Sequence, residues 1–155
     1  MHPAQSQRET SFKDFQKLIK VKFKNLELLH QVFVHRSYLN ENPGFPLNHN
    51  ERLEFLGDAV LELVVTEYLF NKYPNPEGDL TNWRSALVKG QMLASVAQEL
   101  DMGQLLYLSK GEEKSGGKSR ALILANTFEA LIGAIYLDLG YGEAQKFVTR
   151  HLLGR

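Results

Sequence analysis

The 155-residue sequence contains no cysteine, no excess of charge of either sign and no uninterrupted apolar run of membrane-spanning length. The absence of cysteine excludes disulfide bonds and thiolate metal sites. The short apolar runs, and an N-terminus (MHPAQSQRETS) without a signal-peptide core, predict a cytoplasmic protein with no membrane association. Because 18 basic residues balance 18 acidic ones, any indication of a nucleic-acid partner must come from the distribution of charge.

Apolar residues make up 43% of the sequence, which is enough for the core of one ordinary domain. They recur at helical spacing, no stretch reads as a convincing strand, and there is no internal repeat. The sequence therefore predicts an all-α helical bundle over residues 12–153, after a flexible N-terminal segment at 1–11. Helices are expected at 12–20, 25–37, 49–72, 80–99, 119–139 and 142–153. Loops with proline or glycine are expected at 43–46, 74–78 and 109–118.

Four acids stand out in the segment HNERLEFLGDAVLELV, residues 49–64, because the rest of it is as apolar as a core helix. At roughly 100° per residue, the four acids fall on one stripe of that helix. They are Glu51, Glu54, Asp58 and Glu62. A solvated face is the ordinary explanation of such a stripe, and the helix dipole favours an acid at the N-terminus. A second polar stripe favours a different interpretation.

The second stripe lies in LANTFEALIGAIYLDLG, residues 124–140, where Asn126 and Glu129 are three residues apart on one helix face. Each helix also carries a glycine on or beside its polar stripe, Gly57 in the first and Gly133 in the second. Glycine weakens a helix but allows a neighbouring backbone to approach closely. If the helices lie side by side, their polar stripes converge.

That pairing would bring together four oxygen-bearing side chains, Glu54, Asp58, Asn126 and Glu129. Without histidine or cysteine, this donor set suits a hard divalent cation, above all Mg²⁺. Mg²⁺ held by few carboxylates and several waters is typical of phosphoryl chemistry. The sequence thus predicts a magnesium site and no organic cofactor.

Basic residues cluster in two places, although the net charge is zero. Such clusters are usually solvated surface, but beside a cation site they would hold a phosphate backbone. The first cluster, near the start of the chain, consists of Lys17, Lys20, Lys22 and Lys24. The second surrounds the glycine-rich loop and consists of Lys110, Lys114, Lys118 and Arg120.

Phe55 lies close to the acidic stripe rather than opposite it. It can tuck into the core of its own domain at the edge of the stripe, or it can meet a partner subunit. The helical spacing leaves both possibilities open.

The segment NERLEFLGDAVLEL, residues 50–63, closely resembles the signature of the ribonuclease III family, endonucleases that cut double-stranded RNA. Four further segments resemble successive blocks of that family in the same order, so the resemblance covers roughly residues 12–150. These are LLHQVFVHRSYLNEN (28–42), YPNPEGDLTNWRSALV (73–88), LSKGEEKSGGKSRALILAN (108–126) and FEALIGAIYLD (128–138). The resemblance implies an all-α endonuclease domain. Bacterial members usually continue into a double-stranded-RNA-binding domain, so we expect a truncated form of a two-domain enzyme.

The resemblance implies metal-assisted hydrolysis of phosphodiesters in double-stranded RNA, giving 5′-phosphate and 3′-hydroxyl ends with short 3′ overhangs. It implies a role in RNA processing, for example in rRNA maturation, on a substrate recognised mainly by shape. The cluster from Lys110 to Arg120 is then the expected RNA contact. The resemblance also implies a homodimer across the signature helix, with Glu51 and Phe55 at the interface.

By position, the family's metal-binding acids match Glu54, Asp58 and Glu129. Asp58 and Glu129 are the expected catalytic residues, Mg²⁺ is the expected cofactor, and Mn²⁺ the expected substitute. Glu77 matches an accessory acid near the site, although an ordinary turn residue would look the same. The family usually has aspartate where this chain has Asn126, and that departure predicts weaker metal binding.

Two alternatives stay open. A dimeric double-stranded-RNA-binding module of the same fold, with impaired catalysis, would suit Asn126, whereas the three retained acids argue against it. A carboxylate-bridged di-iron bundle would suit the Glu-x-x-His formed by Glu27 and His30, but it needs a second such motif and none is present. A helix histidine at the edge of the core is the simpler explanation of His30.

Overall fold

The structure, a computed structural model, describes the backbone of residues 3–154 and the side chains of residues 7–154. Within this range it is all helical, as predicted, and the only strand-like pairing is one bridge between Val34 and Tyr107. The helices are α1 (Pro3–Ile19), α2 (Leu26–Val32), α3 (Arg36–Glu41), α4 (Glu51–Lys72), α5 (Glu77–Leu87), α6 (Gly90–Glu99), α7 (Lys110–Lys114), α8 (Ala121–Leu139) and α9 (Tyr141–Val148). Two 3₁₀ turns, η1 (Met102–Leu105) and η2 (Gly117–Ser119), and a final π-helical turn, η3 (Thr149–Leu153), join or end them.

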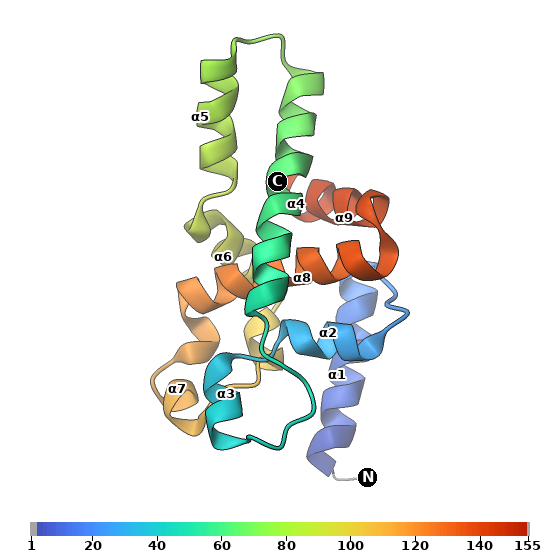
Figure 1. Ribbon diagram of the computed structural model, residues 1–155, viewed down its shortest axis with the longest axis vertical. Helices are drawn as coiled ribbons and strands as arrows, with labels where there is room; N and C mark the ends of the chain where they lie inside the picture. Colours follow the sequence, from blue (N-terminus) through green and yellow to red (C-terminus); the bar gives the residue numbers. More distant parts are fainter. Residues whose placement is uncertain (1–2, 155) are drawn as a thin grey trace.

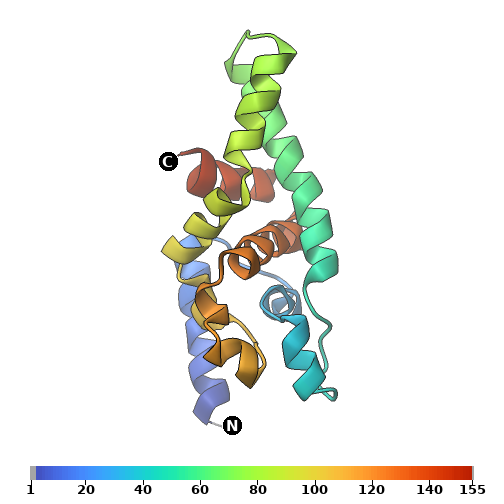
Figure 2. The same cartoon turned by 90° about the vertical axis from the view of Figure 1, so that its left-hand side faces the viewer.

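Helix α8 is the centre of the fold, with α2, α4, α6 and α9 packed against it (Figures 1 and 2). Phe128, Leu131, Ile132 and Ile135 on α8 are fully buried. By length and composition alone α8 could cross a membrane, since its 19 residues have a mean hydropathy of 1.5, and 61% of it is buried inside the protein. Asn126, Glu129 and Asp138 interrupt its apolar sequence, as expected, and the apolar surface of this helix forms the core.

Helices α4 and α8 cross in direct backbone contact, as the two glycines predict. A Cβ atom at Gly57 would overlap the Glu129 carbonyl oxygen and lie 2.9 Å from the Gly133 amide nitrogen. A Cβ atom at Gly133 would overlap the Leu53 carbonyl oxygen. No side chain fits at either position, so this crossing requires glycine on both helices. The close crossing sets the separation of the two polar stripes.

The predicted helix at 80–99 is two helices with different packing partners. α5 begins earlier, at Glu77, and packs along the outer half of α4, so that the two form a hairpin projecting from the body (Figure 1). The chain turns at Val88 and Lys89, and α6 then packs against α8. The segment contains no proline. Gly90 stands at the break as the first residue of α6, and glycine weakens a helix. Helical periodicity does not reveal that the two halves have different packing partners.

The N-terminal segment predicted to be flexible is helical from residue 3. Arg8 ties α1 to the body by donating to the Leu105 carbonyl at 2.8 Å, and its guanidinium carbon lies 3.8 Å from the centroid of the Tyr107 ring. The sequence did not predict this helical start, because these contacts join residues far apart in the sequence; the flexibility of residues 1–11 stays a prediction. Residues 1 and 2 lie outside the described backbone.

The predicted helix at 25–37 is interrupted around Val34, whose strand-like bridge to Tyr107 separates α2 from α3. The His35 ring then caps α3, since its Nδ1 accepts from the Ser37 amide at 3.2 Å. The predicted loop at 109–118 contains the short helix α7 and most of η2.

Candidate active site

Three carboxylates meet where α4 and α8 cross. Glu54 and Asp58 lie one turn apart on α4, and Glu129 lies on α8 beside the contact with Gly57. The Glu129 carboxyl shares a hydrogen bond with Asp58, and the negative charges of both α4 acids act on it. The two polar stripes therefore lie close enough for Glu54 and Asp58 to act on Glu129, whereas the role of the three acids as a metal site stays a prediction.

Glu129 is half-buried in a strongly negative environment. Burial, the hydrogen bond to Asp58 and the negative charges of Asp58, Glu54 and Glu62 together raise the pKa of Glu129 to about 8. In the metal-free chain, this raised pKa favours the protonated form of Glu129 at neutral pH. A cation placed among these acids would favour the ionised form of Glu129. The site is therefore expected to attract positive charge.

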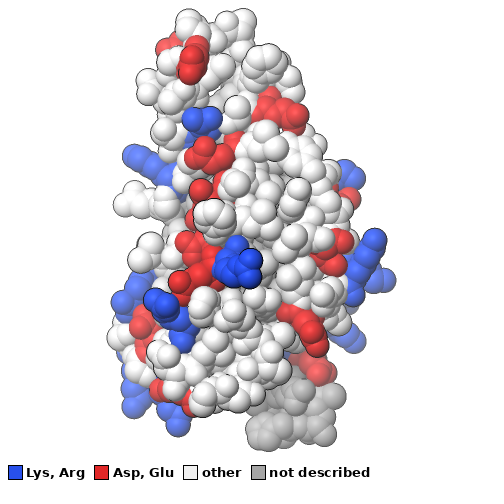
Figure 3. Space-filling model, viewed as in Figure 1, with Lys and Arg blue, Asp and Glu red and all other residues white. Residues whose placement is uncertain are grey.

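The acidic stripe is neutralised at its two ends but not in its middle. Arg36 Nε lies 3.1 Å from a Glu51 carboxylate oxygen, and Arg84 Nε lies 3.8 Å from a Glu62 carboxylate oxygen. Figure 3 shows acidic side chains gathered on this face with basic side chains beside them. No ion pair within residues 7–154 reaches the three central acids, Glu54, Asp58 and Glu129.

Glu54, in the middle of the stripe, also has a raised pKa. Burial is the main cause, followed by the negative charges of Glu51 and Asp58. Two neighbouring acids on different helices thus resist ionisation for the same reasons, burial and like charge. Clustered groups with raised pKa values are typical of functional sites, although structural networks also produce them.

Asn126 lies three residues before Glu129 on α8 and is half-buried. Its position on the helix places it on the same face as Glu129, as predicted. No hydrogen bond joins Asn126 to the three carboxylates in the described part of the chain. Its role as a metal ligand stays a prediction.

The residues present fit a magnesium ion in part. No three histidine, aspartate or glutamate side chains within residues 7–154 already converge as the ligands of a metal. Mg²⁺ does not need such a cage, because it keeps several waters and commonly binds through one or two carboxylates. The unpaired acids Glu54, Asp58 and Glu129 supply oxygen donors of the required kind, and Asn126 could add a neutral oxygen.

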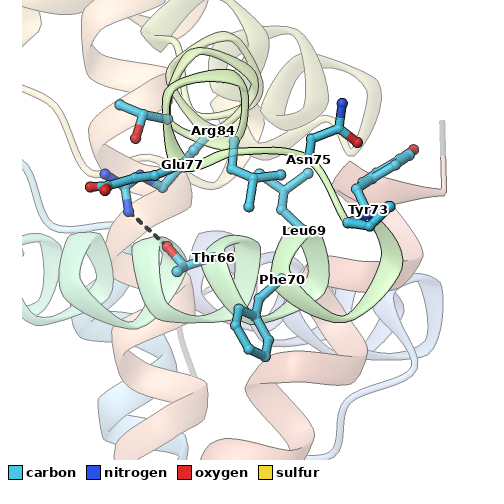
Figure 4. Close-up of a pocket in the computed structure, with 10 residues that line it drawn as sticks. Thr66, Leu69, Phe70, Tyr73, Asn75, Glu77 and Arg84 are labelled. Atoms are coloured by element: carbon cyan, nitrogen blue, oxygen red, sulfur yellow. Dashed lines mark hydrogen bonds between the residues drawn. The ribbon is translucent and has the colours of Figure 1, made fainter.

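Glu77 lies in a different hollow. It is exposed at the first residue of α5 and lines a cavity of about 610 Å³ between α4 and α5, together with Thr66, Phe70 and Arg84 (Figure 4). Arg84 donates to the Thr66 hydroxyl at 2.9 Å in this cavity. Thr66 is eight residues beyond Asp58, roughly 12 Å along the helix. A role for Glu77 as an accessory acid stays a prediction, and no contact within the described residues links it to the acidic site.

Phe55 does not enter the core of its own chain. Its side chain is 84% exposed, and Leu63 and Phe70 on the same side of α4 are 55% and 74% exposed. Helical spacing puts the three on one stripe beside the acidic one. Of the two possibilities that the sequence leaves open for Phe55, burial within the chain is excluded.

The predicted RNA-binding residues surround α7 and η2, just before α8, and two of them have local acidic partners. Lys118 Nζ lies 3.2 Å from Glu113, and Arg120 Nε lies 3.5 Å from Glu112. Lys110 and Lys114 are exposed. None of these contacts tests RNA binding, which stays a prediction for all four.

His30 lies at the edge of the core, where the simpler explanation places it. Its ring stacks on Phe12 with centroids 4.2 Å apart, and burial is the main cause that lowers its pKa. With no convergent metal ligands within residues 7–154, nothing in the structure supports the di-iron alternative.

Sequence reasoning missed the arginines that flank the stripe. Arg84 reaches Glu62 from α5, and Arg36 reaches Glu51 from α3. Helical periodicity relates residues within one helix, so it gives no signal for partners that other helices supply.

Comparison with known proteins identifies the class of fold. A family model described as Ribonuclease-III-like matches residues 25–155. The nuclease domain of ribonuclease III from Campylobacter jejuni, described for flexibility in its region involved in dimer formation, has a TM-score of 0.83 and 40% identity, covering 90% of this chain and 94% of that chain. Dicer from Pichia stipitis has a TM-score of 0.61 and 29% identity, covering 86% of this chain and 55% of that chain. The class is thus the all-helical ribonuclease III nuclease domain.

The curated relatives agree. Ribonuclease 3 of Bacillus velezensis is 54% identical over 138 residues, which are 88% of this chain and 55% of the relative. Ribonuclease 3 of Streptococcus gordonii is 50% identical over 132 residues, which are 84% of this chain and 57% of the relative. This chain belongs to the ribonuclease III family. It spans slightly more than half the length of these curated relatives.

Proposed function

We propose that this chain is a metal-dependent endoribonuclease domain that hydrolyses phosphodiesters in double-stranded RNA. The observation that carries the proposal is the group of three carboxylates at the α4–α8 crossing, which lack cationic partners among the described residues. Burial, the hydrogen bond with Asp58 and the neighbouring negative charges raise the pKa of Glu129 to about 8. The family's name for its curated members supports the same reaction class. The proposed products carry 5′-phosphate and 3′-hydroxyl ends with short 3′ overhangs, and the proposed role is cytoplasmic RNA processing, such as rRNA maturation.

Glu54, Asp58 and Glu129 are the residues that would hold Mg²⁺. Bound there, Mg²⁺ would supply water activation and charge stabilisation for phosphodiester hydrolysis. The hydrogen bond between the Glu129 and Asp58 side chains would hold the two carboxyl groups close together for a shared cation. Asn126 adds an uncharged oxygen on the same face of α8. The arginine pairs at Glu51 and Glu62 leave only the central acids available to a cation.

The proposed working form is a homodimer joined through the outer face of α4. Phe55, Leu63 and Phe70 form an exposed apolar stripe. Burying this stripe against a second copy of the chain would remove apolar surface from water, which favours pairing. A two-fold axis makes such a patch self-complementary and would place two acidic sites on one assembly. Cleavage of both strands follows from that arrangement.

One experiment tests the reaction. The purified chain is incubated with a perfectly paired RNA duplex and Mg²⁺, with EDTA as the control, and the ends of the products are mapped. We expect cleavage that requires the cation and leaves 3′ overhangs. Absence of cleavage at every Mg²⁺ and Mn²⁺ concentration would contradict the proposal.

Asn126 favours a second candidate, an impaired double-stranded-RNA-binding module. A neutral amide gives up one charge among the proposed ligands, which weakens the attraction for a cation. Tight duplex binding without cleavage in the same experiment would identify this second function.

A further inference from the structure

A basic groove lies at the C-terminal end of α1. Its cavity of about 360 Å³ is lined by six residues, none of them acidic. They are Lys13, Gln16, Lys17, Lys20, Val21 and Lys22. Within residues 7–154 none of these four lysines makes an ion pair, so four full positive charges face one hollow. We call it the lysine groove.

The backbone at this groove is unusual. α1 ends with paired hydrogen bonds from Val21 N–H to the Gln16 carbonyl at 3.2 Å and from Lys20 N–H to the Lys17 carbonyl at 3.3 Å. In such a helix end the residue in the position of Lys20 is normally glycine, because φ is positive there. Lys20 has φ of 59° and therefore carries strain that glycine would relieve. Residues in such strained backbone conformations cluster at functional sites.

The simplest role for the four lysines is to stabilise the C-terminal end of α1. This role accounts for only some of them. Cations favour a helix C-terminus, but the effect falls off within the last turn. Lys17 is in that turn, whereas Lys13 lies six residues before the end and Lys22 lies beyond it. Arg150 already donates to the Ile19 carbonyl at 3.2 Å, so the helix end has a cationic partner of its own.

The groove lies at the end of α1, and the acidic site lies where α4 crosses α8. Figure 2 shows α1 and α4 on opposite sides of α8, so the two sites are carried by helices on opposite sides of the central helix. From Lys13 to Lys20 the helix rises roughly 10 Å, a span that suits several successive phosphates better than one small anion.

We propose that the lysine groove binds the phosphate backbone of RNA outside the duplex held at the α4–α8 crossing. The proposal rests on the proposed function, which makes RNA the polyanion that this chain meets. It gives the domain a second contact with branched or long RNA, independent of base sequence.

The test compares two RNA probes in metal-free buffer. One is a plain hairpin stem, and the other is the same stem continued into a second helical arm. Binding is followed by fluorescence anisotropy over a salt series, for the parent, for Lys20→Gly and for Lys17→Ala with Lys20→Gly. The control removes the same charge elsewhere, by Lys72→Ala with Lys89→Ala, at two exposed positions away from α1.

The double variant should bind the two-arm RNA about threefold to tenfold more weakly, with a salt slope less steep by about 1.5, and should bind the plain stem as the parent does. Lys20→Gly alone should melt about 2–4 °C higher because it relieves the positive φ, yet bind the two-arm RNA more weakly. A purely structural role would raise stability and leave binding unchanged.

Two outcomes would overturn the proposal. If the double variant binds both probes as the parent does, the lysines serve only the helix end. If the plain stem loses as much affinity as the two-arm RNA, the groove belongs to the main substrate path. Because binding is measured without metal, a parent chain that binds RNA but never cuts it contradicts the proposed function and leaves this inference standing.

Discussion

Helices α4 and α8 have the same design in the sequence, an apolar helix with one polar stripe and one glycine, yet the fold treats them differently. Neighbours cover the middle of α8, whose Phe128 and Ile135 are fully buried although Leu122 and Leu137 near its ends are exposed. In contrast, α4 leaves Phe55 and Phe70 largely exposed along its outer face. The difference shows that the pKa of a carboxyl group depends on how deeply its helix is buried in the core. Burial is the first cause of the raised pKa of Glu129, the acid on the enclosed helix.

Removing the charge of Glu129 should have the largest effect on cleavage. Glu129→Gln keeps the size of the side chain but removes the charge beside the proposed cation, so cleavage of duplex RNA should fall about a thousandfold while binding survives. Asp58→Asn on α4 should have a comparable effect if both acids hold the same cation. The control is Glu143→Gln, an acid on α9 away from the site. Near-parental cleavage by Glu129→Gln, measured in single turnover, would contradict the proposed role of this acid.

The second largest effect is expected from a substitution at the crossing of α4 and α8. Gly133→Ala would place a Cβ atom on the Leu53 carbonyl and force the two helices apart, at a cost of about 3 kcal/mol in the free energy of unfolding. Gly142→Ala is the matched control, because nothing lies within 4 Å of its Cβ position. Urea denaturation should show a large loss for the first variant only. Equal stabilities would mean that the crossing tolerates separation.

The proposed dimer interface on the exposed side of α4 can be tested by introducing a negative charge there. Phe55→Asp would bury an unpaired carboxylate in the proposed dimer interface and weaken pairing by about 3 kcal/mol. Leu26→Asp, at a residue 52% exposed on α2, controls for a new acid on the surface. Sedimentation velocity should show a monomer for the first variant and a dimer for the second. A parent that is monomeric at micromolar concentration would contradict the assignment of this face.

The contrast in environment also predicts a dependence of stability on pH. The pKa of Glu129 rises from 4.5 to about 8 on folding, so between these values the native state holds a proton that the unfolded state releases. In metal-free buffer, stability should therefore fall as pH rises from 6.5 to 8, and Glu129→Gln should show a shallower fall. Below pH 6.5, the half-buried histidines with lowered pKa act in the opposite direction, which is why the comparison starts there. Identical slopes in thermal melts of parent and variant would refute the cause assigned to Glu129.

The smallest expected effect is at Asn126. Asn126→Asp restores a charge on the face of α8 that carries Glu129, and added repulsion among the acids offsets part of the gain. We expect half-saturating Mg²⁺ for cleavage to fall by about threefold to tenfold, and the parent to work better with Mn²⁺ than with Mg²⁺. Unchanged metal dependence would place Asn126 outside the reach of the cation.

Several features of the site could be predicted because they are local. Spacing by three and four residues puts Glu54 with Asp58, and Asn126 with Glu129, on single helix faces. The glycines predict the crossing, since a glycine in an apolar helix interior has few other uses. What could not be predicted are the arginines at Glu51 and Glu62, the position of Glu77 in a separate cavity, and the helical N-terminus, because each depends on contacts between distant segments.

By itself the sequence determined the all-helical class and the two polar stripes, and it supplied the residues proposed to hold a hard cation, because helical periodicity and side-chain chemistry are properties of the chain. Only the tertiary structure decided that the middle of α8 is buried, that Phe55 is exposed and that α1 and α4 lie on opposite sides of α8. Burial and electric fields arise when segments far apart in sequence pack together. The pKa of Glu129 at about 8 is therefore a property of the fold and not of the glutamate alone.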